Sequence, residues 1–356
     1  MSRIGEFYEY QRGKESPEIT KHKIMFKRRS GYFEVEIPDH GLARVPCHGD
    51  SSSERTNCLL ENVLRHHQKF RFGIHKWADK QSKQPVEEAV SEVNAIALFF
   101  PDTRTENVRI CMAAWLAVLC TVDNLIEAMM IHEAESTLKS AVMTLQSEDK
   151  SDTQNEICSL MAYFHEYCCG YLPYAAVEDL FREICIVFSG FIHELQFRQG
   201  RLKHNFETYM DIRTQTIGIA PFFSLVGSEM PSPVGNTGDI LALKKAINSI
   251  VGLQNDLVGL EKDLDQGESM NSIILAMENA TGDEQAKETQ LADAATSVCS
   301  LHNCNLSEVV KMHHRLTQES RAESEMILAN AMLLFTETHF KWCTMTKRYA
   351  VESTQA

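Results

Sequence analysis

Oxygen-bearing side chains recur at helical spacing in the stretch from Asn255 to Asp263. If this stretch is helical, Asn255, Gly259 and Asp263 lie at positions i, i+4 and i+8 on a single face. An amide oxygen and a carboxylate two turns apart could bind the same hard divalent cation, because such cations take oxygen ligands. A solvated helix end is the alternative interpretation, because charged residues continue from Glu261 to Glu268.

A second acidic pair, Asp123 and Glu127, ends an apolar stretch that begins at Trp115. The two carboxylates are one helical turn apart, and like charges at this spacing repel each other by a few tenths of a kcal/mol. The pair therefore indicates a cation, a base or water beside it. A pair of this kind is also common on ordinary helix surfaces.

Together, these two stretches resemble the paired metal-binding motifs of class I terpene synthases of the microbial or fungal type. The family's first motif reads DDxx(D/E), and Asp123, Asn124 and Glu127 match it with Asn in place of the second Asp. The second motif reads NDxx(S/T)xxx(E/D), usually with Lys before the last acid. The corresponding positions here are Asn255, Gly259, Lys262 and Asp263, so Gly replaces the usual hydroxyl residue.

Two further segments carry the resemblance. Residues 209 to 218 look like the family's YxxxRxxTxG segment, in which the Arg, here Arg213, senses the diphosphate and the following turn breaks the helix. Near the C-terminus, Trp342, Arg348 and Tyr349 resemble the terminal Arg-Tyr pair that closes over the diphosphate. The four motifs occur in the family's order between about residues 95 and 350.

The resemblance implies a Mg2+ cluster that is bound together with the substrate diphosphate. Its metal-binding positions would be Asp123, Glu127, Asn255, Gly259 and Asp263, with water at Gly259 because glycine has no ligand atom. The residues that would hydrogen-bond the diphosphate are Arg213, Lys262, Arg348 and Tyr349. Aromatic faces stabilise carbocations, and the candidates for the cavity wall are Phe99, Trp115 and Phe222, each of which is also explained by simple core packing.

The function that this resemblance implies is a lyase activity: ionisation and cyclisation of a linear prenyl diphosphate. Farnesyl diphosphate is the favoured substrate, and the product would be a cyclic sesquiterpene. One alternative is a diterpene cyclase that uses geranylgeranyl diphosphate. The others are a prenyl transferase that couples the cation to a second molecule, and a non-catalytic helical binding protein with a degenerate site.

Composition restricts the partners of the chain. The formal net charge of -14 argues against nucleic acid as a partner, because contacts to its backbone depend on Lys and Arg. The longest uncharged apolar run, Ile110 to Val122, is shorter than the about 20 residues that span a bilayer. We therefore expect a cytoplasmic protein without a membrane span, either a monomer or a homodimer, that binds a small-molecule prenyl diphosphate.

The elements that must position these residues are helices. We expect an all-α fold, a single-domain bundle with a central apolar cavity, which by resemblance is the class I terpenoid synthase fold. Residues 1–57 form an irregular N-terminal segment, residues 58–350 the helical domain and residues 351–356 a flexible tail. Periodicity predicts helices over residues 58–80, 86–100, 105–132, 135–147, 153–169, 175–199, 205–226, 238–264, 268–280, 284–300, 306–318 and 320–348.

Overall fold

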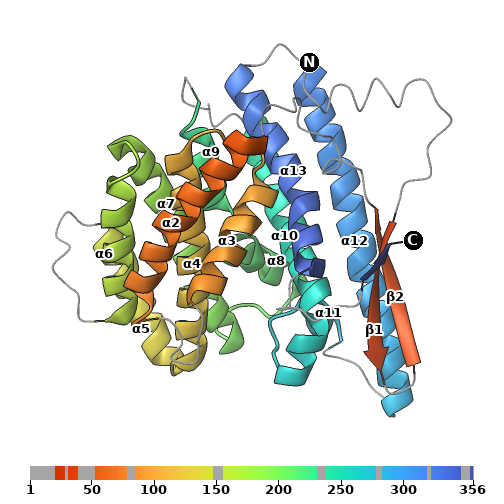
Figure 1. The fold of residues 1–356 in the computed structure, drawn as a ribbon. Coiled ribbons are helices and arrows are strands. Elements are labelled where there is room, and N and C mark those ends of the chain that lie inside the picture. The colour runs from red at the N-terminus through yellow and green to blue at the C-terminus, as the bar shows by residue number, and fades with distance from the viewer. Residues whose placement is uncertain are drawn as a thin grey trace. The chain divides into compact units, whose positions relative to one another are not determined.

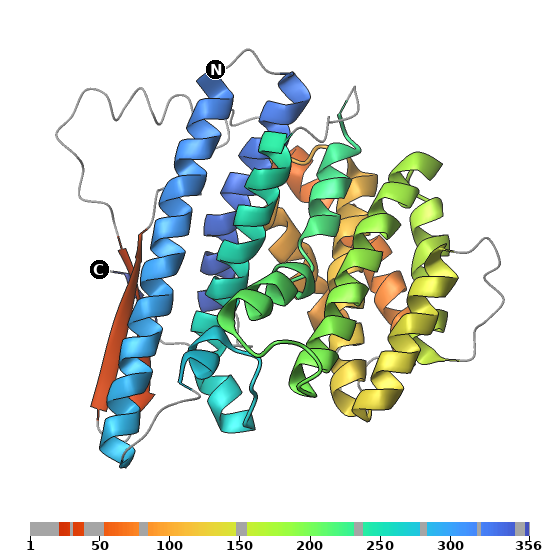
Figure 2. The same cartoon turned by 180° about the vertical axis from the view of Figure 1, so that it is seen from behind.

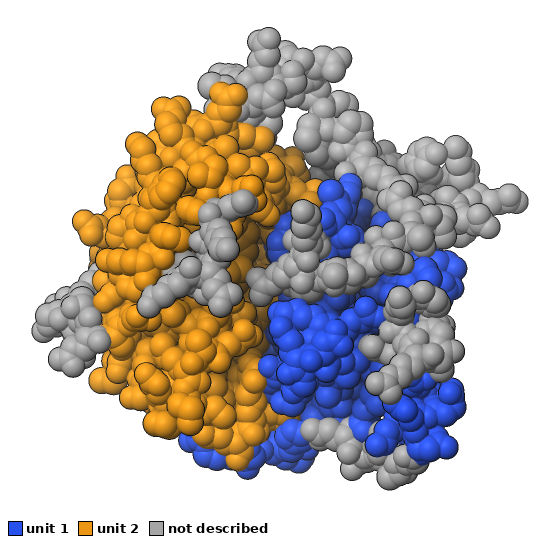
Figure 3. All heavy atoms as spheres, turned by 60° about the horizontal axis from the view of Figure 1, so that its bottom comes forward, with its two compact units in different colours: residues 1–47, 200–214, 235–356 blue, residues 48–199, 215–234 orange. Residues whose placement is uncertain are grey.

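The structure, a computed structural model, describes most of the chain and divides it into two compact units. The described residues are 21–28, 31–38, 53–77, 85–146, 155–230, 238–277, 283–318, 322–345 and 353–355. Unit 1 comprises Met1–Cys47, Gly200–Thr214 and Gly235–Ala356, and unit 2 comprises His48–Gln199 and Gln215–Val234. Figure 3 draws unit 1 in blue and unit 2 in orange.

The regular secondary structure in the described residues of unit 2 is entirely helical. Its helices are α2 (Ser53–Ile74), α3 (Pro85–Phe99), α4 (Glu106–Ala128), α5 (Ile131–Gln146), α6 (Glu156–Cys169), α7 (Tyr174–Arg198) and α9 (Ala220–Gly227). Helix α4 packs against α2, α3, α6 and α9, so it is the central helix of this unit. Of its most apolar 18-residue window, 61% is buried, which is typical of a helix in a protein core, although α4 is also long and apolar enough to cross a bilayer.

Unit 1 combines four helices, most of α8 and a small sheet. Its elements are β1 (Lys21–Arg28), β2 (Gly31–Pro38), α8 (Phe206–Thr216), α10 (Gly238–Gln266), α11 (Ser272–Ala276), α12 (Glu284–Gln318), α13 (Glu323–Met345) and β3 (Ser353–Gln355). Helix α10 packs against α11, α12 and α13, and Figures 1 and 2 show it beside α12 and α13 from both sides. The residues that carry the second metal motif therefore lie on a helix that packs against three other helices of this unit.

The hairpin β1–β2 corrects the expectation that residues 1–57 are irregular. Its strands pair antiparallel with Ile24 opposite Val35, and β3 adds to β1 within the segment expected to be a flexible tail. Alternate residues of the hairpin, including Ile24, Phe26 and Ile37, are buried in a core formed with α10, α12 and α13. Residues 33–37 alternate apolar and charged side chains, as a strand does, but the many Gly, Pro and Ser residues around them favour an irregular segment.

Most of the expected helices are present with ends shifted by a few residues, and three regions differ. The expected helix 268–280 is helical only over Ser272–Ala276 among the described residues. The expected helix 205–226 is divided into α8 and α9, because Gly218 adopts a φ of 69° that ends the helix. A Cβ at Gly218 would lie 2.6 Å from the side chain of Leu119 on α4. Conversely, residues 284–318 form one continuous helix, since the stretch between residues 300 and 306 contains no Gly or Pro to end it.

We expect Ile24→Ala to lower the free energy of unfolding by about 2–4 kcal/mol, because Ile24 is fully buried and the change leaves a cavity. Urea denaturation followed by circular dichroism measures the change. Lys21→Ala on the solvent face of the same strand is the matched control and should change stability by less than about 0.5 kcal/mol. Equal effects of the two substitutions would contradict the packing of the hairpin on the helices.

Candidate functional site

A charged cluster joins α8 to α10 in unit 1. The guanidinium of Arg213 lies 2.9 Å from the carboxylate of Asp256, measured between Nη2 and Oδ1, and the same nitrogen donates a 2.9 Å hydrogen bond to Asn255 Oδ1. The side chain of Asp256 is 0% exposed and that of Arg213 17%. A buried carboxylate of this kind is stable only when it is paired and hydrogen-bonded.

Two more donors reach the carboxylate of Asp256. The hydroxyl of Tyr209 donates to Oδ2 at 2.6 Å, and the backbone N–H of Ser272 donates to the same oxygen at 3.0 Å. Tyr209 lies one turn before Arg213 on α8, so both residues reach α10 from the same helix face. The carboxylate thus connects α8, α10 and the start of α11.

A glycine on α10 makes room for the Arg213 side chain. A Cβ at Gly252 would lie 2.9 Å from Cγ of Arg213, close to where that side chain leaves its own backbone. Asn248, one turn earlier, donates through Nδ2 to the carbonyl of Thr214 at 3.0 Å. Helix α8 therefore lies close against this part of α10.

Asp263, the last acid of the second metal motif, accepts a hydrogen bond from the segment that follows α10. Asn271 Nδ2 donates to Asp263 Oδ2 at 2.9 Å and to the Asp256 carbonyl at 2.8 Å. Burial raises the pKa of Asp263, although the Asn271 hydrogen bond and the charges of Arg213 and Lys262 favour its ionised form. A divalent cation beside this carboxylate would offset the same cost of burial.

The donor set along this face of α10 fits Mg2+. Asn255 and Asp263 supply an amide and a carboxylate oxygen two turns apart, with Gly259 between them. A Cβ at Gly259 would lie 3.3 Å from Asp263 Oδ2, so this position faces the carboxylate. No group of three His, Cys, Asp or Glu that could hold a metal occurs among the described residues. Such a small protein donor set matches the way Mg2+ is held by one or two side chains plus phosphate oxygens.

The other predicted metal residues belong to unit 2. Asp123 is half-buried and Glu127 is exposed, and both lie in the last two turns of α4. The spacing places them on one face of this helix, as the sequence predicts. The structure describes this pair and the α10 face separately, each within its own unit.

The remaining predicted residues divide into described and undescribed positions. Lys262 is half-buried near the end of α10, whereas Arg348 and Tyr349 lie outside the described residues. Trp342 on α13 is also half-buried, and its ring centroid is 6.2 Å from that of His339.

The three aromatic residues expected in the cavity wall are buried in unit 2. Trp115 donates its indole N–H to the Gly218 carbonyl at 3.0 Å, which anchors the break between α8 and α9. Phe99 and Phe222 both lie near Phe100, with ring centroids 6.4 and 5.7 Å from it. These contacts are those of core packing, and a role in a cavity wall stays a prediction.

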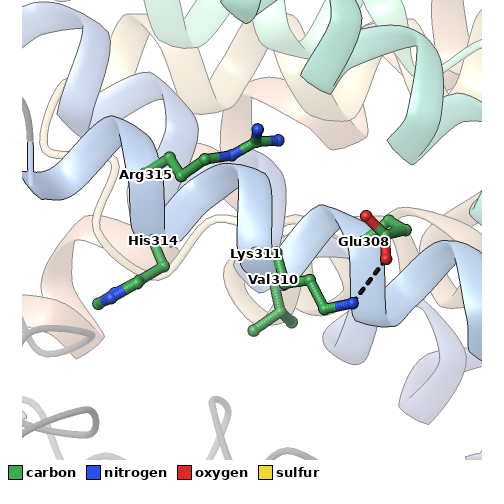
Figure 4. A pocket seen from close by; sticks show the side chains of 5 residues that line it. All are labelled: Glu308, Val310, Lys311, His314 and Arg315. Atoms are coloured by element: carbon green, nitrogen blue, oxygen red, sulfur yellow. Dashed lines mark hydrogen bonds and ion pairs between the residues drawn. The ribbon is translucent and has the colours of Figure 1, made fainter.

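A hollow of about 440 Å³ lies beside α12. Figure 4 shows its described lining, which contains none of the predicted site residues: Glu308, Val310, Lys311, His314 and Arg315. Lys311 pairs with Glu308 at 2.7 Å on the same helix. The hollow is therefore separate from the residues that the sequence predicts for the site.

Four residues of the α10 cluster were not predicted from the sequence as site residues: Tyr209, Gly252, Asp256 and Asn271. Tyr209 and Asp256 belong to the quoted motifs, so their place in the motif was a signal. Asn271 precedes the apolar run of α11 and accepts from the Ile273 N–H, as an N-cap does. Its bridge to Asp263 depends on the turn after α10, which no local pattern specifies.

The family model described as "Terpene synthase family 2, C-terminal metal binding" matches residues 114–304, which is more than half of the chain. The chain belongs to terpene synthase family 2. The matched range contains Asp123, Arg213 and the whole of α10, so it includes both acidic motifs in the order that the sequence predicts.

Curated relatives resemble part of the chain. Terpene cyclase 4 of Gibberella fujikuroi is 27% identical over 144 residues, which are 39% of this chain and 38% of that protein. A (-)-beta-caryophyllene synthase of Saccharothrix espanaensis, described as farnesyl diphosphate cyclizing, is 22% identical over 178 residues, 46% of this chain and 48% of that one. The chain therefore spans less than half the length of these two relatives.

Solved structures share the fold. The crystal structure of a-eudesmol synthase aligns with a TM-score of 0.63 at 14% identity, over 81% of this chain and 95% of that one. The helical architecture is thus the class I terpene synthase fold expected from the sequence, with the β1–β2 hairpin and β3 in addition.

We expect Gly252→Ala to displace Arg213 and to weaken binding of Mg2+-diphosphate about tenfold or more, since shifts of about 1 Å in a site have large effects. Alanine favours helix over glycine by up to about 1 kcal/mol, which offsets part of the stability lost when Arg213 moves relative to Asp256. Isothermal titration with inorganic diphosphate measures the affinity. Gly227→Ala at the end of α9, where nothing lies near the added methyl group, is the control and should bind like the unsubstituted protein.

Proposed function

We propose that this protein ionises and cyclises a linear prenyl diphosphate, with farnesyl diphosphate as the favoured substrate and a cyclic sesquiterpene as the product. The observation that carries the proposal is the position of Arg213, which shares one guanidinium nitrogen between Asn255 and the buried Asp256. This places a fixed cation beside the oxygen donors of α10. Membership of terpene synthase family 2 supports the reaction class.

The side chains of unit 1 would bind and orient the diphosphate. Arg213 is charged at all relevant pH values and offers further N–H donors for charge-assisted hydrogen bonds. The Asp256 carboxylate holds the Arg213 guanidinium in place through the ion pair. Tyr209 and the Ser272 N–H donate hydrogen bonds to that carboxylate and stabilise it. Lys262, Arg348 and Tyr349 are proposed as additional diphosphate contacts.

Two donor pairs would hold Mg2+: Asn255 and Asp263 on α10, and Asp123 and Glu127 on α4. When bound, Mg2+ supplies positive charge that stabilises diphosphate as a leaving group. The position at Gly259 would be completed by water, because this residue offers no ligand atom. Preorganised donors of this kind act mainly by stabilising charge that develops in the transition state.

The choice of substrate rests on the relatives. The Saccharothrix espanaensis protein is described as acting on (2E,6E)-farnesyl diphosphate, and this supports a C15 substrate here. Geranylgeranyl diphosphate is the second candidate, and a prenyl transferase acting on the same fold is the third. A panel of C10, C15 and C20 diphosphates with Mg2+, assayed for diphosphate release and for products by mass spectrometry, decides among them. Absence of turnover with every substrate would refute the proposal.

We expect Asp123→Ala and Asn255→Ala each to reduce diphosphate release by more than about 100-fold, because each removes a proposed metal ligand. Circular dichroism should be unchanged for both variants. Asp265→Ala, an exposed acid on the same helix as Asn255, is the control and should retain full activity. Turnover at the unsubstituted rate in either alanine variant would show that the residue does not hold metal.

Gly259 stands where the family's second motif has a Ser or Thr hydroxyl, so a substitution at this position tests the role of that hydroxyl. We expect Gly259→Ser to lower the Mg2+ concentration required for half-maximal activity, because its hydroxyl would face Asp263, which must shift by a few tenths of an ångström. Gly259→Ala adds the same Cβ without the oxygen and is the matched control. An identical Mg2+ dependence in the two variants would exclude this position from the metal site.

A further inference from the structure

The residue before Asn255 on α10 belongs to a different polar cluster. Gln254 is 1% exposed and lies among buried residues of α12 and α13. Its Nε2 donates to the Thr336 carbonyl at 2.9 Å and lies 3.2 Å from His302 Nε2, while its Oε1 lies 2.9 Å from His339 Nδ1. Each polar atom of this side chain therefore has a partner in the core.

His339 is neutral in this environment. Burial, with a smaller effect from the nearby charge of Arg213, lowers the pKa of His339 to about 3. A neutral imidazole has one N–H donor and one acceptor nitrogen. Which nitrogen carries the proton is therefore decided by the neighbouring groups.

Two backbone carbonyls fix the direction of the amide and imidazole hydrogen bonds in this cluster. A carbonyl only accepts, so Gln254 must present its NH2 group to Thr336 and its oxygen to His339, whose Nδ1 then carries the proton. Asn303 in the same way donates to the Glu36 carbonyl of β2 at 2.9 Å and presents Oδ1 to His302 Nδ1 at 2.9 Å.

His302 receives the same assignment from both of its neighbours. The Asn303 oxygen requires a proton on Nδ1, and the Gln254 NH2 group requires a bare Nε2. Cys343 Sγ lies 3.6 Å from His339 Nε2 and 3.8 Å from Nδ1. Because Nδ1 donates to Gln254, the Cys343 thiol is the donor to Nε2. The result is one ordered chain from Cys343 through His339, Gln254, His302 and Asn303 to the carbonyl of Glu36.

Successive side chains on a helix point about 100° apart, since there are 3.6 residues per turn. Gln254 points to α12 and α13, Asn255 to Arg213, and Asp256 to Tyr209. Apolar neighbours such as Leu253 and Leu257 would pack in several rotations of the helix, whereas a hydrogen-bond chain with fixed directions fits one. Buried polar groups are known to specify register in this way.

We propose that Gln254, His302 and His339 are positioning residues whose ordered hydrogen-bond chain fixes the rotation of α10 and so holds Asn255 against Arg213. This inference rests on the proposed function, in which that face of α10 binds the diphosphate. The hydrogen-bond chain also makes the rotation of α10 depend on the N-terminal hairpin, because its last bond is to the Glu36 carbonyl of β2.

The tautomers test the chain without any activity measurement. In protein labelled with 15N-histidine, long-range 1H–15N correlation spectra should show a protonated Nδ1 and a bare Nε2 for both His302 and His339, with each ring assigned from a single H302Q or H339N variant. The exposed His132 is the internal comparison. A proton on Nε2 of His302 or His339 would break the chain and overturn the proposal.

The matched variants H339N and H339L test the positioning role. The two side chains have the same size and branching, but only asparagine can place a donor where Nδ1 stands. H339L should bind Mg2+ with inorganic diphosphate about tenfold more weakly than H339N, equivalent to about 1.4 kcal/mol, and its KM should rise more than its kcat falls. H302Q and H302M form a second pair, in which only glutamine keeps an acceptor for Gln254.

The outcomes separate this proposal from the proposed function. If the unsubstituted protein neither binds Mg2+-diphosphate nor turns over a prenyl diphosphate, the proposed function fails. The histidine tautomers alone then test the hydrogen-bond chain. If it does both while each matched pair binds diphosphate equally, the positioning role is overturned. If an apolar variant does not fold, the other pair and the tautomer assignment decide the outcome.

Discussion

The carboxylate of Asp256 is the constraint on which the site depends. A fully buried negative charge costs several kcal/mol unless cations and hydrogen bonds replace its water. Arg213, Tyr209 and the Ser272 N–H supply this replacement, and they come from α8 and from the segment after α10. Removing any one partner would leave part of the charge unpaired. The arrangement of three chain segments is therefore fixed by a group that itself faces the protein interior.

The consequence for the proposed chemistry is preorganisation. Because Asp256 holds the guanidinium, Arg213 approaches Asn255 without needing a substrate to order it. Asp263 is held in the same way by Asn271, whose other bond is to the Asp256 carbonyl. Asp256 thus supports both the arginine proposed to bind the diphosphate and, through its backbone carbonyl and Asn271, the acid proposed to bind metal. Fixed dipoles and charges of this kind need no reorganisation when charge develops in a substrate.

Three glycines are as important to this region as the charged side chains. Gly252 leaves space for the Arg213 stem, and Gly259 leaves the face between Asn255 and Asp263 open. Gly218 adopts a positive φ and is enclosed by Leu119, so it ends α8 at a defined place. Periodicity alone predicted one helix across this point, since the flanking residues are apolar on both sides. The break depends on a backbone conformation that only glycine adopts easily.

The sequence by itself determined the helical architecture, the order of the motifs and the shared face of Asn255 and Asp263. These properties depend on local periodicity, and a spacing of four residues has the same meaning in any helix. Only the tertiary structure decided the partners of Asp256 and Asn271, the ordered chain at Gln254 and the packing of the hairpin. Those contacts join residues distant in the chain, such as Glu36 and Asn303. Their formation depends on how segments pack against one another, which no local pattern specifies.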